Sequence, residues 1–467
     1  MAKTEVMRFF DFSGGVNRKV SPYINSPNEL AKGINVTLDK KLGALVKRNG
    51  YTSLGDDLGT GNILGLYGYE KADGTSIPLL VYGTDWYKLV DSTWTSLSQT
   101  LTASKKASHV TFLNQCFMSN GTDAMRNYDG TDVSTVRNVT GAPVVKYMEV
   151  YDTRVFGIGN STYPSRLYYS KLPAEDNTIA WDTTNDWHDV QTDDNDIGMG
   201  IIKNGNRLLV FKDYSLYYWD TYNLKKIPDA LGTPSSRSIS NGKTRTYYFS
   251  RDGVSFYESG QVQIISRPIQ PFIDGISETY YPSICGAAWK DHYYLFVGDI
   301  SNTDEDISVT NALLDYHETT NSWTIHSLKT APLVFSPMTV SSARSMYFGD
   351  NAGEVFKWLS GNNDDGSEIA AEAETPRIYF KYPELTKQPV KMWFFSKYGS
   401  DVSVSYNLDD GEWKRLGNLD EPVKKFNFPA DIKTCHDIAF KFSETSSLAP
   451  FEIYGGAIYV DNKGDQD

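Results

Sequence analysis

The sequence predicts an all-β protein built around a β-propeller of about seven blades. The main observation is an aromatic-rich hairpin that recurs through the middle of the chain, as in residues 79–83 followed by 85–89, and in 346–349 followed by 354–358. The first strands of the copies start near residues 79, 115, 154, 208, 246, 293 and 346. A mean step of roughly 45 residues is the period of propeller blades. One hairpin cannot bury its apolar face alone, so the copies must pack against each other.

Length and composition agree with this prediction. The 31 tyrosines and 37 glycines among 467 residues favour strands joined by tight turns. A hydrophobic content of 40% is sufficient for a folded core. The length predicts two or three domains rather than one compact core.

Changes in pattern along the chain give the domain boundaries. Residues 1–61 form an irregular N-terminal arm, and residues 62–361 carry the repeated hairpins. A polar linker separates these from 367–462, where alternating strands predict a small antiparallel β-sandwich or barrel. We expect residues 463–467 to be a frayed tail.

The arm itself has a predicted order of elements. A short helix is expected over residues 28–32, ended by Gly33 as a C-cap. Alternation over 34–38 predicts a strand, and the turn that follows leads to a second strand at 44–48. These two strands are predicted to form a hairpin.

Charge and targeting features narrow the classes of function. A net charge of −13 argues against a protein that grips nucleic acid with its whole surface, because phosphate neutralisation requires Lys and Arg. The N-terminus lacks the apolar segment of a secretory signal, and no apolar run approaches a membrane span. The three cysteines, Cys116, Cys285 and Cys435, are far apart, and we expect buried reduced thiols.

Two acidic turns offer a functional and a structural interpretation. Residues 405–413 resemble the Asp-box hairpins of sialidases, but the single copy favours an ordinary turn in which Asp-Gly supplies positive φ and Trp413 packs over it. Residues 192–198 place carboxylates at alternate positions, as a calcium loop does. No bidentate Glu follows at the required distance, so a solvated blade loop is favoured. The same applies to residues 302–306.

Catalytic motifs have no specific support in the sequence. The six histidines lack close ligand spacing, and His317 and His326 could meet only across a hairpin. Neither a Gly-rich phosphate loop nor a Gly-x-Ser-x-Gly elbow occurs. We therefore expect no enzyme activity, no cofactor and no metal site.

The N-terminal cassette resembles a known family. Residues 11–17, 26–36 and 43–51 follow one another in the order seen at the start of β-propeller structural proteins from the tails of double-stranded DNA bacteriophages. Asn49 stands where that family usually has Pro. Residues 166–170 with Trp181 downstream, and the pair of segments 196–198 and 208–211, are further recurring elements. Size and domain order are similar to the tail hub, or nozzle, of short-tailed phages.

This resemblance implies a role and partners. Members of the family form rings, usually of six copies, that extend the portal and adaptor and surround the exiting genome. It implies a virion tail protein, made in the host cytoplasm, that contacts the head–tail adaptor, the portal, and tail fibre or spike proteins, with passing double-stranded DNA. An acidic lumen would repel phosphate and keep that DNA mobile.

The arm is the expected assembly element. Residues 1–51 are rich in turns and have too few apolar positions for their own core, so we expect them to pack on the propeller or on a neighbouring subunit. Phe12, Gly14, Gly15 and Asn17 are the candidate assembly residues, with the two glycines allowing a bend. Deleting residues 1–20 is then expected to impair assembly more than folding.

Alternative functions remain open at this stage. A phage receptor-binding or fibre-anchoring protein would use exposed aromatic residues on sugars and form a trimer. A propeller glycosidase would need convergent carboxylates and arginines at the propeller centre. A cellular propeller scaffold is less favoured, because the WD signature is absent.

Overall fold

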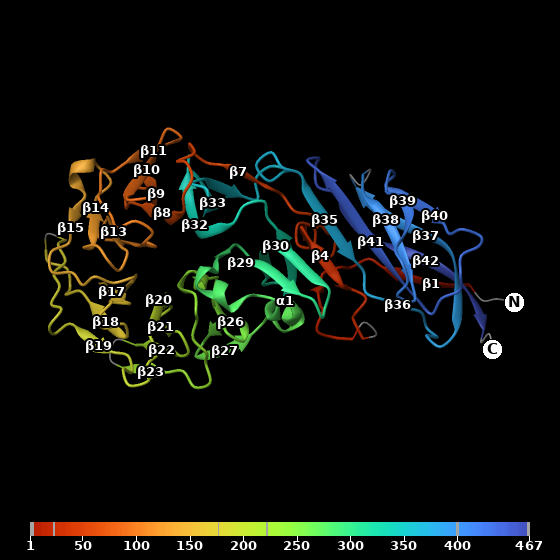
Figure 1. Cartoon of the computed structure of the whole chain (residues 1–467), viewed down its shortest axis with the longest axis horizontal. Coiled ribbons are helices and arrows are strands. Elements are labelled where there is room, and N and C mark those ends of the chain that lie inside the picture. The colour runs from red at the N-terminus through yellow and green to blue at the C-terminus, as the bar shows by residue number, and fades with distance from the viewer. Residues whose placement is uncertain (1–3, 22–23, 176, 221–222, 398–400, 465–467) are drawn as a thin grey trace.

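The computed structural model describes residues 4–21, 24–175, 177–220, 223–397 and 401–464. In it, six four-stranded antiparallel sheets and a four-stranded part of a ten-stranded sheet form a ring of seven blades beside a β-sandwich (Figure 1). The predicted propeller is therefore confirmed. The first five blades are built from consecutive strands, running outward from the axis: β8 (Ile63–Glu70), β9 (Ser76–Tyr82), β10 (Asp85–Val90) and β11 (Thr93–Ser96); β12 (Ser108–Phe112), β13 (Gln115–Ser119), β14 (Arg126–Tyr128) and β15 (Arg137–Asn138); β16 (Tyr147–Tyr151), β17 (Arg154–Ile158), β18 (Arg166–Tyr169) and β19 (Trp187–Asp189); β20 (Gly198–Asn204), β21 (Arg207–Lys212), β22 (Leu216–Trp219) and β23 (Leu224–Lys226); β24 (Ser240–Asn241), β25 (Thr246–Ser250), β26 (Gly253–Glu258) and β27 (Gln261–Ile264).

The ring is closed by a strand from the N-terminal region. The sixth blade comprises β28 (Cys285–Trp289), β29 (His292–Asn302), β30 (Ile307–His317) and β31 (Ser322–Ser327). The seventh comprises β32 (Pro332–Val340), β33 (Ala343–Asp350) and β34 (Val355–Trp358), and its outermost strand is β7 (Tyr51–Ser53). The last blade thus takes a strand that precedes the first blade in the chain, and the propeller extends beyond the range 62–361 drawn from the sequence.

The recurring hairpins of the sequence are the middle of each blade. Each predicted strand start lies in, or at the first residue of, the second strand of one blade, from β9 to β33. The innermost strands contact one another around the ring, from β8 through β12, β16, β20, β24 and β28 to β32, and back to β8. Buried side chains fill each gap between neighbouring blades. The blades are held by this packing, as the repeat predicts.

The packing between neighbouring blades can be tested by a substitution at Trp219. Its side chain lies between the third and fourth blades, is 8% exposed, and has its ring centre 4.5 Å from that of His188. Replacing Trp219 with alanine is expected to lower the free energy of unfolding by about 3–5 kcal/mol, because a buried indole leaves a cavity. Urea denaturation measures the change. Trp413→Ala, at a partly exposed tryptophan, is the control; equal effects of the two substitutions would contradict the prediction.

The helices are short. Within the second blade, η1 (Val133–Thr135) joins β14 to β15, whereas the helices that connect blades are η2 (Ser236–Ser238), η3 (Arg267–Ile269), α1 (Gln270–Asp274) and η4 (Glu278–Ser283). Among the described residues, none of the helices has the length and apolar composition needed to cross a membrane. The three cysteines are buried and free, as the sequence predicts.

The C-terminal domain is an antiparallel sandwich that includes arm strands. One sheet has the order β40-β37-β42-β6-β5, and β1 also pairs with β42. The other sheet continues the sixth blade in the order β31-β4-β35-β41-β38-β39, and β36 also pairs with β41. The bounds of these strands are β1 (Thr4–Phe9), β4 (Lys32–Ile34), β5 (Val36–Thr37), β6 (Leu45–Lys47), β35 (Ile369–Glu374), β36 (Ile378–Tyr379), β37 (Thr386–Lys397), β38 (Ser403–Leu408), β39 (Lys414–Asn418), β40 (Val423–Asn427), β41 (Asp437–Ser446) and β42 (Glu452–Gly464).

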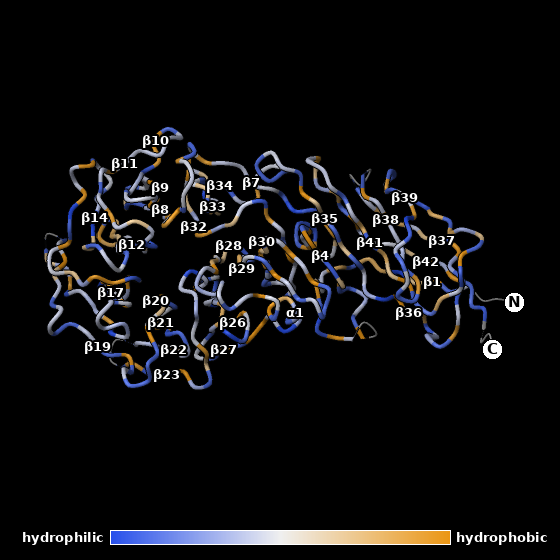
Figure 2. Tube along the Cα trace, viewed as in Figure 1, coloured by the Kyte–Doolittle hydropathy of each residue, from blue (hydrophilic) through white to orange (hydrophobic). Residues whose placement is uncertain are grey.

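One sheet therefore runs from the propeller into the sandwich. Strand β4 pairs in parallel with β31 through Ile34 and Ile325, and antiparallel with β35. Figure 1 shows β4, in red, lying between the sixth blade and the blue strands of the sandwich. A single buried cluster joins arm, fifth and sixth blades and sandwich. Figure 2 shows hydrophobic residues on the strands of both parts, with hydrophilic residues prominent in the outer loops.

The helix predicted over residues 28–32 is wrong. This segment contains the strand β3 (Glu29–Leu30), which pairs in parallel with β2 (Gly15–Val16), and Gly33 lies inside β4 rather than at a helix end. Leu30 is fully buried, and the amide of Ala31 donates to the carbonyl of Glu374 at 2.9 Å. Five residues are too few to stabilise a helix by themselves, so pairing with neighbouring strands decides the conformation. The predicted hairpin is confirmed as the antiparallel pair β5 and β6.

Candidate functional sites

The joint between propeller and sandwich is built by Lys47 and Arg48, at the end of β6. Lys47 is buried and its Nζ lies 2.7 Å from Oε2 of Glu444, in the sandwich strand β41. The guanidinium of Arg48 makes a two-pronged contact, at 2.7 and 2.6 Å, with Asp364 in the linker that follows the seventh blade. Lys47, the last residue of β6, and Arg48, which follows it, thus make separate buried ion pairs with the sandwich and with the linker after the seventh blade.

Further contacts fix the Arg48 guanidinium. It donates to the side chain of Asn35 at 2.9 Å and to the carbonyl of Ser327 at 3.2 Å, and it lies 5.5 Å from the ring centre of Trp358. A planar group with five donors fits such a multiple contact. The arm, the sixth blade and the seventh blade meet at this one side chain.

The four candidate assembly residues of the arm lie in contacts within the chain. Phe12 is 1% exposed in the shared core. Gly15 has φ of +68°, and a Cβ there would lie 2.7 Å from the carbonyl oxygen of Trp323, so the bend expected at Gly14 and Gly15 is present. A Cβ on Gly14 would also clash, with Glu29 and Asn28. Asn17 donates to Glu29 at 2.8 Å. Their role in assembly stays a prediction.

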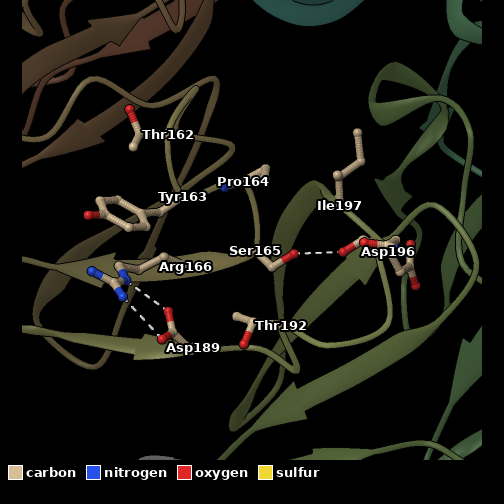
Figure 3. A pocket seen from close by; sticks show the side chains of 10 residues that line it. Thr162, Tyr163, Pro164, Ser165, Arg166, Asp189, Thr192, Asp196 and Ile197 are labelled. Carbon is tan, nitrogen blue, oxygen red and sulfur yellow. Dashed lines mark hydrogen bonds and ion pairs between the residues drawn. The ribbon is translucent and has the colours of Figure 1, made fainter.

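An open pocket of about 460 Å³ lies between the third and fourth blades (Figure 3). Arg166 lies between the rings of Tyr163 and Trp187, with its guanidinium carbon 4.1 and 3.5 Å from their centres, and it pairs with Asp189 at 2.8 Å. The Asp189 hydrogen bond and ion pair raise the pKa of Arg166. The charge of Arg166 is paired with Asp189, and the guanidinium covers a face of each aromatic ring. These contacts lie within the protein, so the cluster has a structural role.

The same pocket contains two segments from the family resemblance. Ser165 donates to the carbonyl of Asp196 at 2.6 Å, and a Cβ on Gly198 would lie 2.7 Å from the carbonyl of Pro164. The Asp196 carboxylate accepts from Ser215 at 2.6 Å and from the amide of Tyr214. Both segments therefore join neighbouring blades. Asp194, a carboxylate of the calcium interpretation, instead pairs with buried Lys212 at 2.7 Å.

Arg237 reaches across the centre of the propeller. It lies in η2, between the fourth and fifth blades, yet its guanidinium donates to the carbonyls of Leu64 in the first blade and Leu333 in the seventh. Burial lowers its pKa to about 10. Lys106, also near this centre, has its pKa lowered to about 8, by burial and then by Arg237. Arg237 therefore bridges backbone groups of the first and seventh blades.

A cluster of Asp and His side chains forms where the turn between β5 and β6 touches the sixth blade. His292 lies between two carboxylates, with Nδ1 2.7 Å from Asp315 and Nε2 2.9 Å from Asp39. Burial disfavours its charge, but the two carboxylates outweigh burial and raise the pKa of His292 to about 10. The pKa of Asp39 is lowered, because His292 outweighs the effect of burial.

The histidine pair expected from the sequence is different in the structure. His317 does not meet His326: it lies opposite His292 in the β29–β30 register, with ring centres 4.8 Å apart. His326 instead contacts Asp315 at 3.1 Å, and burial lowers the pKa of His326. His317 lies in β30 and His326 in the neighbouring strand β31, but the first side chain contacts His292 and the second contacts Asp315.

The Asp-box-like turn is an ordinary hairpin with a shifted conformation. The positive φ angles belong to Asp409 at 46° and Asp410 at 61°, rather than to Gly411. Asp residues adopt this region more readily than most. Trp413 packs against Lys441, whose Nζ lies 4.6 Å from the ring centre.

Comparisons with known proteins give fold-level similarities. The sequence matches no protein-family model and no curated protein. The chain is similar to the extracellular domain of a putative hybrid two-component system from B. thetaiotaomicron, at 11% identity and a TM-score of 0.43, covering 84% of this chain and 47% of that chain. The AfRom2 CNH domain is similar at 11% identity and a TM-score of 0.43, covering 66% of this chain and 98% of that domain. The chain spans about half the length of the first of these.

Proposed function

We propose that this protein is a structural component of a bacteriophage tail that assembles into a ring and serves as a hub or nozzle for the exiting genome. The family that it resembles usually forms rings of six copies. The proposal rests on the N-terminal cassette, residues 11–17, 26–36 and 43–51. Those residues supply β2 to β6 and the Lys47–Arg48 joint. The residues that carry the resemblance are therefore the ones that fix the sandwich to the propeller.

A rigid two-domain body suits a load-bearing ring. The sheet that runs from β28 to β39 and the shared core prevent independent hinge motion of the two domains. A closed propeller also leaves few free strand edges that could pair with the wrong chain. Contacts to the portal, adaptor and tail fibre or spike proteins belong to this proposal.

The path of the genome lies outside the single propeller. Arg237 crosses the propeller centre and bridges opposite blades, so a duplex has no passage there. The hole of the assembled ring is the conduit in this proposal. A net charge of −13 suits a wall along which DNA slides, because acidic surfaces repel phosphate.

Oligomeric state tests the proposal. Size-exclusion chromatography with light scattering, followed by class averages of the particles, is expected to give closed rings, and virion images are expected to place the protein around the tail axis. Binding of free duplex DNA at physiological salt should be weak. A trimer at the tail periphery would support the receptor-binding alternative, and tight, salt-sensitive DNA binding would contradict the conduit.

A further inference from the structure

The cluster of Asp and His side chains where the turn between β5 and β6 touches the sixth blade has the arrangement of a metal site. One ligand atom from each of Asp39, His292 and His317 lies within 4.8 Å of the other two. The three residues come from separate parts of the chain: Asp39 from the turn between β5 and β6, and the two histidines from facing positions at the open end of the β29–β30 hairpin. The fold, rather than local sequence, brings them together.

The second nitrogen of each histidine is held by another group. Nδ1 of His292 contacts Asp315 at 2.7 Å, and Asp315 is itself held by His326. Nδ1 of His317 contacts the hydroxyl of Thr320 at 2.6 Å. Histidines that ligate metals generally use one nitrogen for the metal and bond the other to a carboxylate or another polar partner, which fixes the ring orientation. The Nε2 atom of each ring is therefore the one available for a common ligand, and Nε2 of His292 lies 2.9 Å from Asp39, which is itself one of the three residues.

Packing and charge favour a cation at the same position. The ring of His292 lies flat against Tyr294, with ring centres 5.2 Å apart and planes 2° from parallel. Asp39, Asp315 and the nearby Asp291 provide three carboxylates around two imidazoles, and Lys243 pairs with Asp291. The ring is held in place and the negative charge exceeds the positive charge contributed by Lys243.

We infer that Asp39, His292 and His317 form a binding site for a divalent transition metal of the Zn²⁺ type, which ties the arm turn to the sixth blade. Imidazole and carboxylate ligands suit Zn²⁺ and Co²⁺, whereas Mg²⁺ and Ca²⁺ prefer oxygen ligands alone. Water completes the fourth position. Binding displaces the proton shared by His292 and Asp39, while Asp315 continues to orient the ring. This inference is independent of the proposed function in the phage tail.

Metal titration of the whole protein tests the site. After dialysis against a chelator, isothermal titration with Zn²⁺ is expected to show one ion per chain, with a rise in melting temperature. Co²⁺ is expected to give the visible absorption of a four- or five-coordinate ion, which Zn²⁺ then abolishes. Absence of stoichiometric Zn²⁺ binding at neutral pH would overturn the inference.

Matched substitutions locate the ion. His317→Gln keeps a polar side chain beside Thr320 and is expected to weaken Zn²⁺ binding at least tenfold. His436→Gln is the control, since His436 has a carboxylate 3.8 Å away, in Asp409, but belongs to no group of three ligands among the described residues. Equal Zn²⁺ affinity of the two variants would overturn the site. If His317→Gln is unstable, the Co²⁺ spectrum of the unmodified chain decides between imidazole ligation and its absence.

Discussion

Replacing Asp364 with alanine is expected to lower the free energy of unfolding by about 3–5 kcal/mol, because it leaves a buried guanidinium without its carboxylate. The side chains of Arg48 and Asp364 are 1% and 2% exposed. The remaining hydrogen-bond partners of Arg48, which are the side chain of Asn35 and the carbonyls of Asn49 and Ser327, are neutral and cannot balance its charge. Urea denaturation monitored by tryptophan fluorescence measures the loss.

An exposed ion pair provides the matched control. Asp410 pairs with Arg377 but its side chain is 92% exposed, so Asp410→Ala is expected to cost less than about 1 kcal/mol. Arg48→Met combined with Asp364→Leu is expected to lose less stability than Asp364→Ala alone, because no unpaired charge remains. A change below about 1 kcal/mol for Asp364→Ala would show that the joint does not depend on this pair.

The propeller could be predicted because its signal is local and repeated. Several blades place an apolar strand, a tight turn and an aromatic strand within about 15 residues, as in β33 and β34, and a period of two is visible in such segments. The arm has no such repeat. Its strands have two to six residues, and β1 pairs with β42 at the opposite end of the chain. Pairing across that separation leaves no pattern in either segment.

The two sites differ in how much the sequence reveals. Lys47 and Arg48 stand in a segment that the family resemblance singles out, but two adjacent cations usually indicate a solvated turn, and their burial depends on Glu444 and Asp364 far along the chain. His292 and His317 could have been paired by counting outward from the turn between β29 and β30. The bulges in that hairpin shift the register, so the count is reliable only with the structure in hand.

Deleting residues 1–10 is expected to destabilise the sandwich more than any single substitution in the arm. The deletion removes β1, whose six residues pair with β42, and removes Phe9, which is 5% exposed and packs against Phe12, Phe394 and Phe440. Loss of the Phe9 ring alone corresponds to about 3–5 kcal/mol. The deletion also exposes the β42 edge, which favours aggregation. Thermal unfolding and light scattering measure both effects.

This expectation reverses the one drawn from the sequence, where removal of residues 1–20 impairs assembly more than folding. Phe9→Ala and Phe10→Ala separate the two, because these neighbours differ in exposure, at 5% and 48%. If the arm acts through the sandwich core, Phe9→Ala costs several kcal/mol and Phe10→Ala costs less than about 1 kcal/mol. If a truncated chain keeps its melting temperature and loses only its ring, the arm acts between subunits, and the contacts of β1 with β42 contribute little to folding.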